Sequence, residues 1–539
     1  MDSLKRLFIW FQSHALVSII VLAIVLRLVN LSTNPPGLNW DEVSMGYSAY
    51  SILETGRDEW GVKFPILFRS YGEWKSPVYI YLIVPFIKIF GLNEWGVRLP
   101  AAIFGVFSVY LTYLLGKKLY SNEVGLWASF LLAVSPWHLM LSRPAFEAGV
   151  ALTLIMAGIY LLLQKKPIIA SLVLGLSLHT YHSAKIVVPF ILLYFAYTLF
   201  KKIELKKVII SFLILGIFVY PIASDLLTGR SQKRFAQVGL TTDAELTERF
   251  FKYRTTFPLG DLGNKLVFNK YTFILSKGFS NWTSYLSPHF LLGSESIRAQ
   301  HSIPFRGVLY LSEFALMCYG VMVLVKKHRG PALILPLLLI GVGFIPPALT
   351  KDLYHVLRSI LTLPWWQLLA ALGLVELKKN KFPYLKIVNW ILIIEVVIFL
   401  MTYFIWYPKA FARDWQYGTK EMVTWVTSQE DNYKHIYVTK TYGEPQLFFA
   451  FYAKWDPAKY QEDNKKLIDY ESLGYPWLDQ LPEYTIGKYT FRDINWAKDN
   501  GQNERLFIGK ADDFWGDTPR ALEVKFPDGT TAYIAAEGK

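Results

Sequence analysis

Long apolar stretches alternate with short polar segments over the first three quarters of the chain. Apolar runs long enough to cross the roughly 30 Å hydrocarbon core of a bilayer recur from about residue 14 to about residue 406. A run in that environment satisfies its own backbone polar groups as a helix. The pattern therefore predicts a polytopic α-helical membrane protein. We expect about eleven transmembrane helices, near 14–31, 98–115, 123–141, 145–163, 168–181, 185–200, 208–225, 306–325, 331–349, 354–376 and 386–406.

The pattern changes after the last apolar run. Residues 408–539 are polar, and they mix helical periodicity with short alternating segments that are typical of strands. Asp528-Gly529 between two such segments predicts a hairpin turn. We therefore expect a transmembrane domain at 1–407 and a small soluble α/β domain at 408–539. Its expected elements are helices at Thr419 to Thr427 and Pro445 to Ala453, and strands at His435 to Thr439, Arg505 to Ile508, Leu522 to Phe526 and Thr531 to Ala535.

One apolar run decides the topology. Residues 76–91 contain Pro77 and Pro85 and are shorter than the ~20 residues that a spanning helix needs. We interpret this run as a juxtamembrane helix at the outer surface, with Lys5 and Arg6 holding the N-terminus inside. Every later basic cluster then falls on the cytoplasmic side. These clusters are Lys117 and Lys118; Lys165 and Lys166; Lys201, Lys202, Lys206 and Lys207; Lys326, Lys327 and Arg329; and Lys378, Lys379 and Lys381.

This topology predicts a multi-pass protein of the plasma membrane with a cytoplasmic N-terminus and an extracytoplasmic C-terminal domain. The outer loops are then 32–97, 142–146, 182–185, 226–305 and 350–354. The loop 226–305 has short amphipathic pieces rich in aromatic residues, which are typical of a segment on the membrane surface.

The composition agrees with a membrane protein and excludes other classes. Hydrophobic residues make up 53% of the 539 residues, and mean hydropathy is +0.28. The formal charge of +14 comes from clusters between apolar runs, which favours a topology signal over a nucleic-acid surface. Cys318 is the one cysteine, so an intramolecular disulfide or a thiolate metal site is excluded.

Two adjacent carboxylates stand out in the first outer loop. Asp41 and Glu42 follow Asn39 and Trp40, directly before a helical pattern. One interpretation is structural, with Asp41 as an N-cap and Glu42 as a first-turn residue that the helix dipole favours. The other is catalytic, with Trp40 stacking on a sugar ring. The two are compatible, because a cap holds a carboxylate rigidly.

A second acidic position occurs at the next outer turn. Arg143 and Glu147 can form an i,i+4 ion pair, worth only about 0.3–0.5 kcal/mol at an exposed surface. However, an arginine at the outer boundary of a span runs against the positive-inside trend and calls for an anionic partner. Arg27, near the outer end of the first helix, either pairs with Glu42 or extends to the membrane surface.

Further cations collect at outer positions. Each alone is explained by an extended side chain or a structural ion pair, but together they suggest a bound phosphate. They are Lys75, His182, Lys185, His355 and Arg358, with Tyr181 beside them and Arg298 and His301 as less specific candidates. Cations stabilise the charge that grows on a phosphate leaving group, and one carboxylate suffices as the general base. These residues therefore predict a glycosyltransferase with a polyprenyl-phosphate sugar donor, and direct displacement inverts the anomeric configuration.

Several motifs resemble those of the GT-C superfamily of membrane glycosyltransferases, in the branch of bacterial protein O-mannosyltransferases and aminoarabinose transferases. They are NWDE at 39–42, EWKSP at 73–77, NEWGVRLP at 93–100, SRPAFEAG at 142–149, YHSAK at 181–185 and HVLRS at 355–359. The resemblance implies that Asp41 and Glu42 are catalytic and that Lys75 contacts the carrier phosphate, although Ser76 separates it from Pro77. The resemblance also implies that Glu147 is a second acidic residue of the site.

The resemblance also bears on ligands. Some relatives bind a divalent metal, which would fall on Asp41 and Glu147, and others bind none. The donors are polyprenyl or dolichyl phosphate sugars, and the acceptor is a protein, a glycan or a lipid. Sugar or acceptor contacts are expected from Trp40, Tyr181 and His301.

Two other classes of protein fit a multi-span chain. A transporter or flippase of a lipid-linked sugar would place its polar residues near the bilayer midplane, whereas the charged residues here cluster at one face. A structural or assembly protein would leave the Asp41-Glu42 and Arg143-Glu147 pairs without a common purpose.

Overall fold

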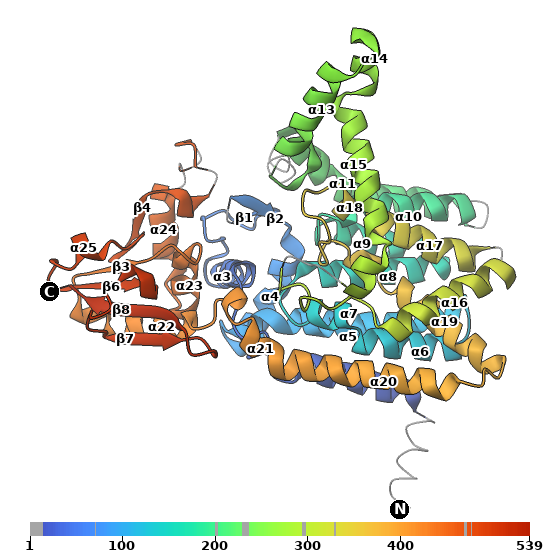
Figure 1. Cartoon of the computed structure of the whole chain (residues 1–539), viewed down its shortest axis with the longest axis horizontal. Coiled ribbons are helices and arrows are strands. Elements are labelled where there is room, and N and C mark those ends of the chain that lie inside the picture. The colour runs from blue at the N-terminus through green and yellow to red at the C-terminus, as the bar shows by residue number, and fades with distance from the viewer. Residues whose placement is uncertain are drawn as a thin grey trace, which may run out of the picture. The chain divides into compact units, whose positions relative to one another are not determined.

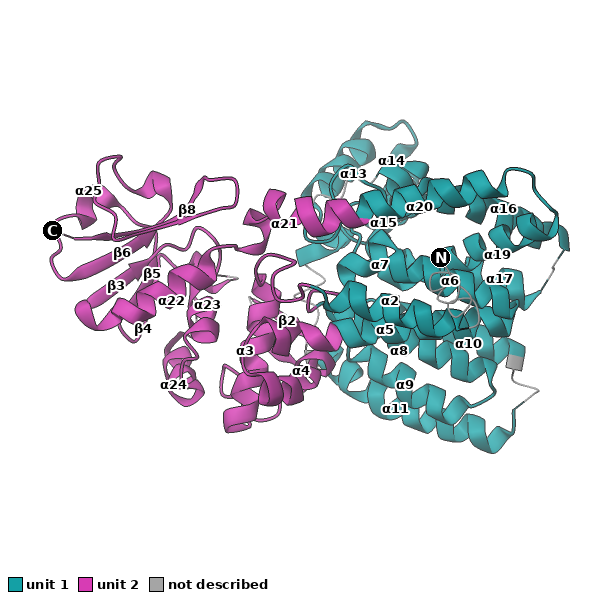
Figure 2. Ribbon diagram, turned by 90° about the horizontal axis from the view of Figure 1, so that it is seen from below, with its two compact units in different colours: residues 1–29, 102–142, 146–399 teal, residues 30–101, 143–145, 400–539 magenta. Residues whose placement is uncertain are grey.

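The computed structural model describes residues 14–70, 72–199, 203–228, 237–293, 298–327, 330–467, 470, 472–475 and 477–538. Lys5, Arg6, Lys201, Lys202 and Arg329, which entered the topology prediction, lie outside the described residues. The chain divides into two compact units, coloured separately in Figure 2. Unit 1 comprises residues 1–29, 102–142 and 146–399, and unit 2 comprises 30–101, 143–145 and 400–539.

Unit 1 is a bundle of apolar helices that run alongside one another (Figure 1). Its helices are α2 (Ala15–Leu28), the greater part of α5 (Glu94–Leu119), α6 (Asn122–Val134), α7 (Pro136–Leu141), α8 (Glu147–Leu163), α9 (Pro167–Leu178), α10 (Ala184–Leu199), α11 (Leu205–Thr228), α16 (Leu311–Lys327), α17 (Pro331–Gly343), α18 (Ile345–Ala348), α19 (Trp365–Lys379) and α20 (Leu385–Met401). Each expected span therefore contains helix. Among the residues that the structure describes, five segments are long and apolar enough to cross a membrane by length and composition. The total of eleven stays a prediction.

Glycines set the closest helix contact in the bundle. A Cβ on Gly320 of α16 would lie 2.0 Å from the carbonyl oxygen of Leu369, and one on Gly373 of α19 would lie 2.0 Å from that of Leu316. The two backbones approach closely because both positions lack a side chain, as is common between helices in membranes.

An acidic residue inside the last apolar helix also has a structural role. Glu395 of α20 accepts hydrogen bonds from the backbone amides of Leu311 (2.9 Å) and Ser312 (3.2 Å), and from the Ser312 hydroxyl. These amides begin α16 and have no partner within their own helix, so Glu395 caps it.

The large outer loop of unit 1 forms a projecting hairpin of helices. It consists of α13 (Ala244–Thr256), α14 (Gly260–Val267) and α15 (Lys270–Tyr285), and it projects from the bundle across the direction of α16 and α19 (Figure 1). Short helices here agree with the amphipathic pieces expected from the sequence.

Unit 2 begins with the first outer loop. Helix α3 (Trp40–Thr55) is followed by a hairpin of β1 (Phe68–Ser70) and β2 (Glu73–Lys75), and then by α4 (Pro77–Phe90), which packs against α3. With 14 residues, α4 is about 21 Å long and too short to cross the hydrocarbon core. Its length and its place in unit 2 agree with the juxtamembrane helix expected for residues 76–91.

The C-terminal region of unit 2 is an α/β domain, as predicted. Its six-stranded sheet has the order β4-β5-β3-β6-β8-β7, in which β3 is parallel to β5 and β6 and the other pairs are antiparallel. The strands are β3 (His435–Val438), β4 (Glu483–Ile486), β5 (Tyr489–Arg492), β6 (Arg505–Gly509), β7 (Leu522–Lys525) and β8 (Thr531–Glu537). The helices include α22 (Thr419–Gln429), α23 (Pro445–Tyr452) and α24 (Pro457–Leu467). Gly529, with φ +85°, makes the predicted turn between β7 and β8.

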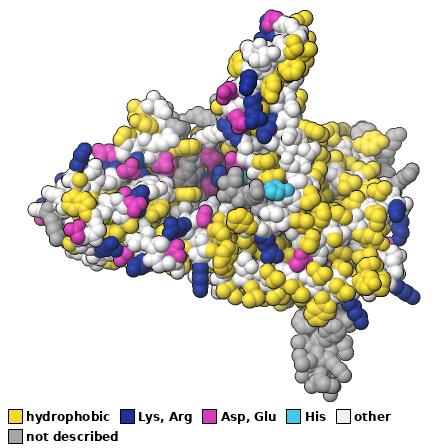
Figure 3. All heavy atoms as spheres, viewed as in Figure 1, with side chains coloured by type: hydrophobic (Ala, Val, Ile, Leu, Met, Phe, Trp, Pro, Cys, Tyr) yellow, Lys and Arg dark blue, Asp and Glu magenta, His cyan; other side chains and the backbone are white. Residues whose placement is uncertain are grey.

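The two units differ in their surface chemistry. Figure 3 shows hydrophobic side chains over most of the helix bundle, and charged side chains of both signs over the C-terminal domain. The apolar covering of unit 1 is the surface that lipid requires, whereas the C-terminal domain has the mixed charge of a water-facing protein.

Candidate active site

The start of helix α3 is fixed by a capping box. Asn39 is the N-cap residue: its side chain accepts a hydrogen bond from the Glu42 amide (2.9 Å), and the Glu42 carboxylate accepts one from the Asn39 amide (3.1 Å). This reciprocal pair satisfies two amides that the helix leaves open. The prediction of Asp41 as N-cap is therefore wrong, whereas Glu42 is a first-turn residue as predicted.

Glu42 is fully buried and its carboxylate is completely engaged. Arg98 donates to it from Nε (2.8 Å) and Nη2 (3.0 Å), and the Ala145 amide donates at 2.9 Å. Together with the Asn39 amide, four hydrogen bonds occupy its two oxygens. A carboxylate can be buried as an ion only with such partners, so Glu42 has a structural function.

Arg98, the partner of Glu42, is a residue that the site prediction missed. It is fully buried, and besides Glu42 it donates to the carbonyl oxygens of Leu31 (3.0 Å), Pro35 (2.8 Å) and Gly37. Arg98 thus ties the chain before α3 to the start of the next helix. An arginine at the outer end of a predicted span was the signal that could have found it.

The expected pairing of Arg27 with Glu42 is wrong. Arg27 is buried in unit 1, where it lies 2.7 Å from the His138 ring and donates to the carbonyl oxygens of Ala23 and Ala133. Glu42 has Arg98 instead.

Asp41 differs from its neighbour in both exposure and partners. Its side chain is 49% exposed, and one carboxylate oxygen lies 2.5 Å from Nζ of Lys75. Lys75 is 5% exposed and lies in β2, where Glu73 is a second carboxylate at 3.5 Å. Two candidates 34 residues apart in the sequence therefore meet, with the carboxylate in contact with solvent and the ammonium group behind it.

The C-terminal domain holds helix α3 along its length. Trp40 donates from its indole to the carbonyl oxygen of Tyr442 (2.7 Å), and Tyr47 donates to that of Trp455 (3.0 Å). Gly443, with φ +103°, leaves room for Trp40, because a Cβ there would lie 2.3 Å from the indole nitrogen. The stacking of Trp40 on a sugar stays a prediction.

Further along α3, one amide from the domain makes three bonds. Nε2 of Gln461 in α24 donates to the hydroxyls of Ser51 (2.9 Å) and Thr55 (3.0 Å) and to the carbonyl oxygen of Asp58 (3.0 Å). The helix that presents Asp41 is therefore anchored at both ends by residues some 400 positions later in the chain.

Arg143 is also buried in unit 2. It donates to the carbonyl oxygen of Asn34 (2.8 Å), and its guanidinium lies 5.0 Å from the ring of Phe404 and 5.7 Å from that of Tyr403. These contacts hold the turn between α7 and α8. A phosphate contact by Arg143 stays a prediction.

Unit 1 brings together another part of the predicted cations. The rings of His301 and His355 lie 4.9 Å apart, and the ring of Phe146 lies 5.5 Å from that of His301. Arg358 lies 3.8 Å from Asp352, and its amide donates to the His355 ring (3.3 Å). Segments around residues 146, 301 and 355 thus converge.

Four further candidates lie in unit 1. Nζ of Lys185 is 3.5 Å from the His182 ring, at the start of α10, and Tyr181 is buried beside them. Glu147 is the first residue of α8 and is partly buried. Unit 1 therefore carries Glu147, His182, Lys185, His301, His355 and Arg358, and unit 2 carries Trp40, Asp41, Glu42, Lys75 and Arg143.

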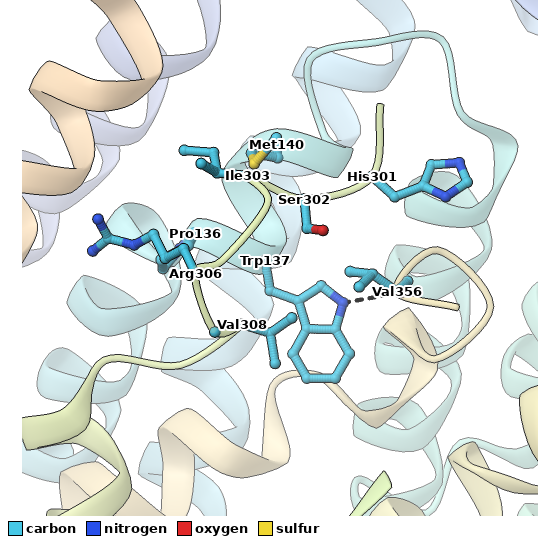
Figure 4. A pocket seen from close by; sticks show the side chains of 10 residues that line it. Pro136, Trp137, Met140, His301, Ser302, Ile303, Arg306, Val308 and Val356 are labelled. Atoms are coloured by element: carbon cyan, nitrogen blue, oxygen red, sulfur yellow. Dashed lines mark hydrogen bonds between the residues drawn. The ribbon is translucent and has the colours of Figure 1, made fainter. Parts of the chain in front are cut away.

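A small pocket lies next to His301 (Figure 4). Its walls are mostly apolar, and the indole of Trp137 donates to the carbonyl oxygen of Val356 (3.1 Å) at its base. The side chains of His301 and Arg306 point to opposite sides of it. Within the described part of the chain, no group of three or more His, Cys, Asp or Glu residues is placed to hold a metal ion.

Comparison with known proteins finds one family model and one solved structure that resemble this chain. A family model described as dolichyl-phosphate-mannose-protein mannosyltransferase matches residues 74–224. The structure of ArnT from Cupriavidus metallidurans bound to undecaprenyl phosphate superimposes with a TM-score of 0.52 at 11% identity, over 96% of this chain and 97% of that one. The chain therefore shares the GT-C fold of that membrane glycosyltransferase. Its apolar helices and this fold are those of a multi-pass membrane protein.

Sequence relatives match shorter stretches. The dolichyl-phosphooligosaccharide-protein glycotransferase 2 of Pyrococcus horikoshii is 31% identical over 110 residues, which are 20% of this chain and 14% of the relative. A putative mannosyltransferase YycA of Bacillus subtilis is 26% identical over 208 residues, covering 35% of this chain and 30% of that one. The chain thus aligns with less than a third of either relative.

Proposed function

We propose that the chain transfers a sugar from a polyprenyl-phosphate-linked donor to an acceptor hydroxyl on the extracytoplasmic face of the plasma membrane. The observation that carries the proposal is the division of roles between two adjacent carboxylates. Glu42 is buried with four hydrogen bonds and fixes the start of α3, so that Asp41 stands half-exposed at a defined position. A rigidly held carboxylate in contact with solvent is what a general base requires.

In this proposal Asp41 takes the proton of the acceptor hydroxyl as its oxygen attacks the anomeric carbon. The bond between that carbon and the phosphate oxygen breaks in the same step, and the polyprenyl phosphate leaves with the bonding electrons. A phosphate is a good leaving group, so no general acid is needed. A single displacement inverts the anomeric configuration, and the product anomer can be read by NMR.

The phosphate of the donor is assigned to the cations predicted from the sequence. Lys75 is the first, because its ammonium group touches Asp41 and is therefore next to the reacting hydroxyl. We assign Arg143, His182, Lys185, His355 and Arg358 to the same role, as the sequence predicts. Cations there offset the charge that accumulates on the phosphate in the transition state.

The remaining candidates keep the roles that the sequence gives them, except one. Glu147 is proposed as the second acidic residue, and Trp40, Tyr181 and His301 as contacts of the sugar or the acceptor. Glu42, predicted to be catalytic, is proposed instead as a positioning residue, because all its hydrogen-bonding capacity is used inside the protein.

Two names among the similar proteins support the donor class. The ArnT structure is described as bound to undecaprenyl phosphate, and the archaeal relative is named for a dolichyl-phosphate-linked donor. The family model and the archaeal relative are both named for transfer to protein, which makes a protein hydroxyl the first acceptor class to examine.

The test is transfer by the purified chain in lipid nanodiscs. A panel of radiolabelled undecaprenyl-phosphate hexoses and pentoses is offered with a membrane extract of acceptors, and release of undecaprenyl phosphate is followed. We expect release from at least one donor, and a polyprenyl phosphate in the mass spectrum of the copurified lipid. No release from any donor beyond the level of Asp41→Asn would refute the proposal.

A further inference from the structure

The outer hairpin formed by α13, α14 and α15 leaves large apolar side chains uncovered. Leu262 and Leu266 of α14, and Tyr271, Leu275 and Phe279 of α15, are between 67% and 78% exposed. In each helix these residues are four positions apart, so they form one stripe along one face. We call them the hairpin stripes.

The hairpin has aromatic contacts of its own, and they involve residues other than the exposed stripes. Phe250 of α13 packs against Phe251 (4.2 Å between ring centres) and Phe273 (6.2 Å), and Phe268 packs against Phe257 (4.8 Å) and Tyr253 (6.0 Å). Phe250 is buried, whereas Phe251, Tyr253 and Phe257 are between 44% and 53% exposed, and the rings join α13 to α15 and to the segments that flank α14. The hairpin stripes are additional apolar surface, which needs an apolar partner outside the protein.

The base of the hairpin is fixed to the bundle. Trp282 donates from its indole to the carbonyl oxygen of Gly341 (2.7 Å), and Asn281 donates to that of Ala348 (3.1 Å). Tyr285, at the end of α15, is fully buried and its hydroxyl accepts from the His355 amide (2.9 Å). Because α15 is a continuous helix, its direction follows from these contacts.

That direction crosses the long axes of the bundle helices. Within unit 1, α15 runs across α16, α19 and α20 (Figure 1), and α19 and α20 belong to segments long and apolar enough to span a membrane. The hairpin therefore extends sideways from the bundle. Basic residues flank the stripes: Arg249, Lys252, Arg254, Lys265, Lys270 and Lys277 outnumber the acidic Glu245, Glu248 and Asp261. Figure 3 shows hydrophobic and basic side chains next to one another on this projection.

We propose that the hairpin stripes insert into the outer leaflet of the bilayer, with the flanking basic side chains on the headgroups of anionic lipids. An amphipathic helix in the membrane plane, with aromatic and leucine residues on one face and lysines beside them, has this behaviour. The hairpin is then a lateral anchor, and its rigid connection through Tyr285 holds the segment of His355 at a fixed depth. This inference concerns lipid contact and holds whether or not the chain transfers sugar.

The experiment measures depth in the membrane, residue by residue. Cys318 is the single cysteine, so Cys318→Ala gives a background into which one cysteine at a time is placed and labelled with a fluorophore. The test positions are Leu262 and Leu266, and the matched controls are Asp261 and Lys265, which lie one residue earlier on another face of the same helix. The full chain is placed in nanodiscs that contain phosphatidylglycerol and brominated lipid.

We expect quenching by brominated lipid to be about twofold or more stronger at Leu262 and Leu266 than at the two controls. Lys270→Gln with Lys277→Gln should reduce this quenching in nanodiscs with phosphatidylglycerol and change it little in zwitterionic ones. Equal and weak quenching at all four positions would refute the proposal. A blue-shifted emission at Leu262 and Leu266 without quenching would also refute it, because it would show a protein partner on the stripes.

Discussion

Glu42 and Arg98 form a buried ion pair that fixes the geometry around Asp41. If one partner is removed, the other remains as an uncompensated buried charge, which typically costs about 3–5 kcal/mol. We therefore expect Glu42→Gln and Arg98→Met each to lower the free energy of unfolding by an amount of that order. Thermal unfolding in detergent measures this change.

Asp41→Asn is the matched control, because Asp41 is half-exposed and its loss should leave the melting temperature almost unchanged. An equal loss of stability in all three variants would contradict the assignment of different roles to the two carboxylates.

Arg358 and Arg298 provide a matched pair for the phosphate assignment. Both lie near Asp352, at 3.8 Å and 3.6 Å, but the side chain of Arg358 is 15% exposed and that of Arg298 is 56% exposed. A charge-assisted hydrogen bond to phosphate is worth roughly 1.5–3 kcal/mol, or about 10- to 100-fold in affinity. We expect Arg358→Ala to raise KM for the lipid donor by about that factor, and Arg298→Ala to change it little. Steady-state kinetics at varied donor concentration measure KM in both variants. Equal values of KM in the two variants would contradict the phosphate assignment.

Asp41 and Lys75 were predicted as site residues from their types and outer positions, and they meet in the structure. Arg98 was not predicted as a site residue. Like Arg143, it is an arginine at the outer end of a predicted span, but it was used only to mark where that span begins. The role of Glu42 could not be predicted, since adjacent carboxylates look alike until burial separates them. For Arg27, both alternatives, a pair with Glu42 and an extended side chain, were wrong, because its neighbour His138 comes from a helix more than a hundred positions away.

At the scale of elements, α24 supports α3 through one glutamine. Gln461→Ala removes three hydrogen bonds and leaves the buried hydroxyl of Ser51 without this donor, at a cost of about 1–3 kcal/mol. We expect it to lower kcat, because α3 carries Asp41, and to leave KM for the donor nearly unchanged. The control is Gln429→Ala in α22, whose amide bonds only to exposed neighbours. If KM for the donor rose and kcat stayed unchanged, the role of α24 in positioning Asp41 would be contradicted.

Helix α23 begins at a buried carboxyl group that should make the domain sensitive to pH. Burial raises the pKa of Glu444 from an ordinary 4.5 to about 8, and Asp479 adds to this effect, while the Gln446 side chain, the Leu478 amide and Arg69 oppose it. The folded domain therefore binds a proton that the unfolded chain releases. The stability that Glu444 contributes is complete below pH 4.5 and is lost as the pH rises towards 8.

Glu444→Gln should remove this dependence. We expect the variant to gain stability over the wild type as pH rises from 5 to 8, measured by thermal unfolding of the full chain at each pH. Burial also raises the pKa of nearby Glu59, so both proteins keep some loss at high pH and the difference between them is the informative quantity. A constant difference across this range would contradict the shifted pKa of Glu444.

Some elements of the C-terminal domain could be predicted from the hydrophobic pattern and others could not. Strands β3, β6, β7 and β8 and helices α22 and α23 were predicted near their true positions, and the Asp528-Gly529 turn was correct. Strands β4 and β5 and helix α24 were missed. Helix α24 has the polar sequence PAKYQEDNKKL, whose buried side chains include Gln461 and Asn464. Its apolar face is too small to give a hydrophobic period.

At the scale of the whole molecule, hydrophobic runs predicted the helical membrane domain and the change of character after the last span. The pattern could not predict that the first outer loop and the C-terminal region belong to one compact unit. That grouping depends on contacts such as those of Trp40 with Tyr442 and of Tyr47 with Trp455, which are local in space and about 400 residues apart in sequence. A domain boundary placed at one position in the sequence cannot represent a unit that is formed by two separate segments.

The central claim is that Asp41 is the base of a sugar transfer from a lipid phosphate. Its most direct test is the single-turnover rate of undecaprenyl phosphate release in nanodiscs, compared between the wild type and Asp41→Asn with each donor at saturation. We expect the rate to fall by about 10²- to 10⁴-fold, as for the loss of a general base, with donor binding and melting temperature retained. A variant that turned over at the wild-type rate would show that the proton goes elsewhere and that the account of this site is wrong.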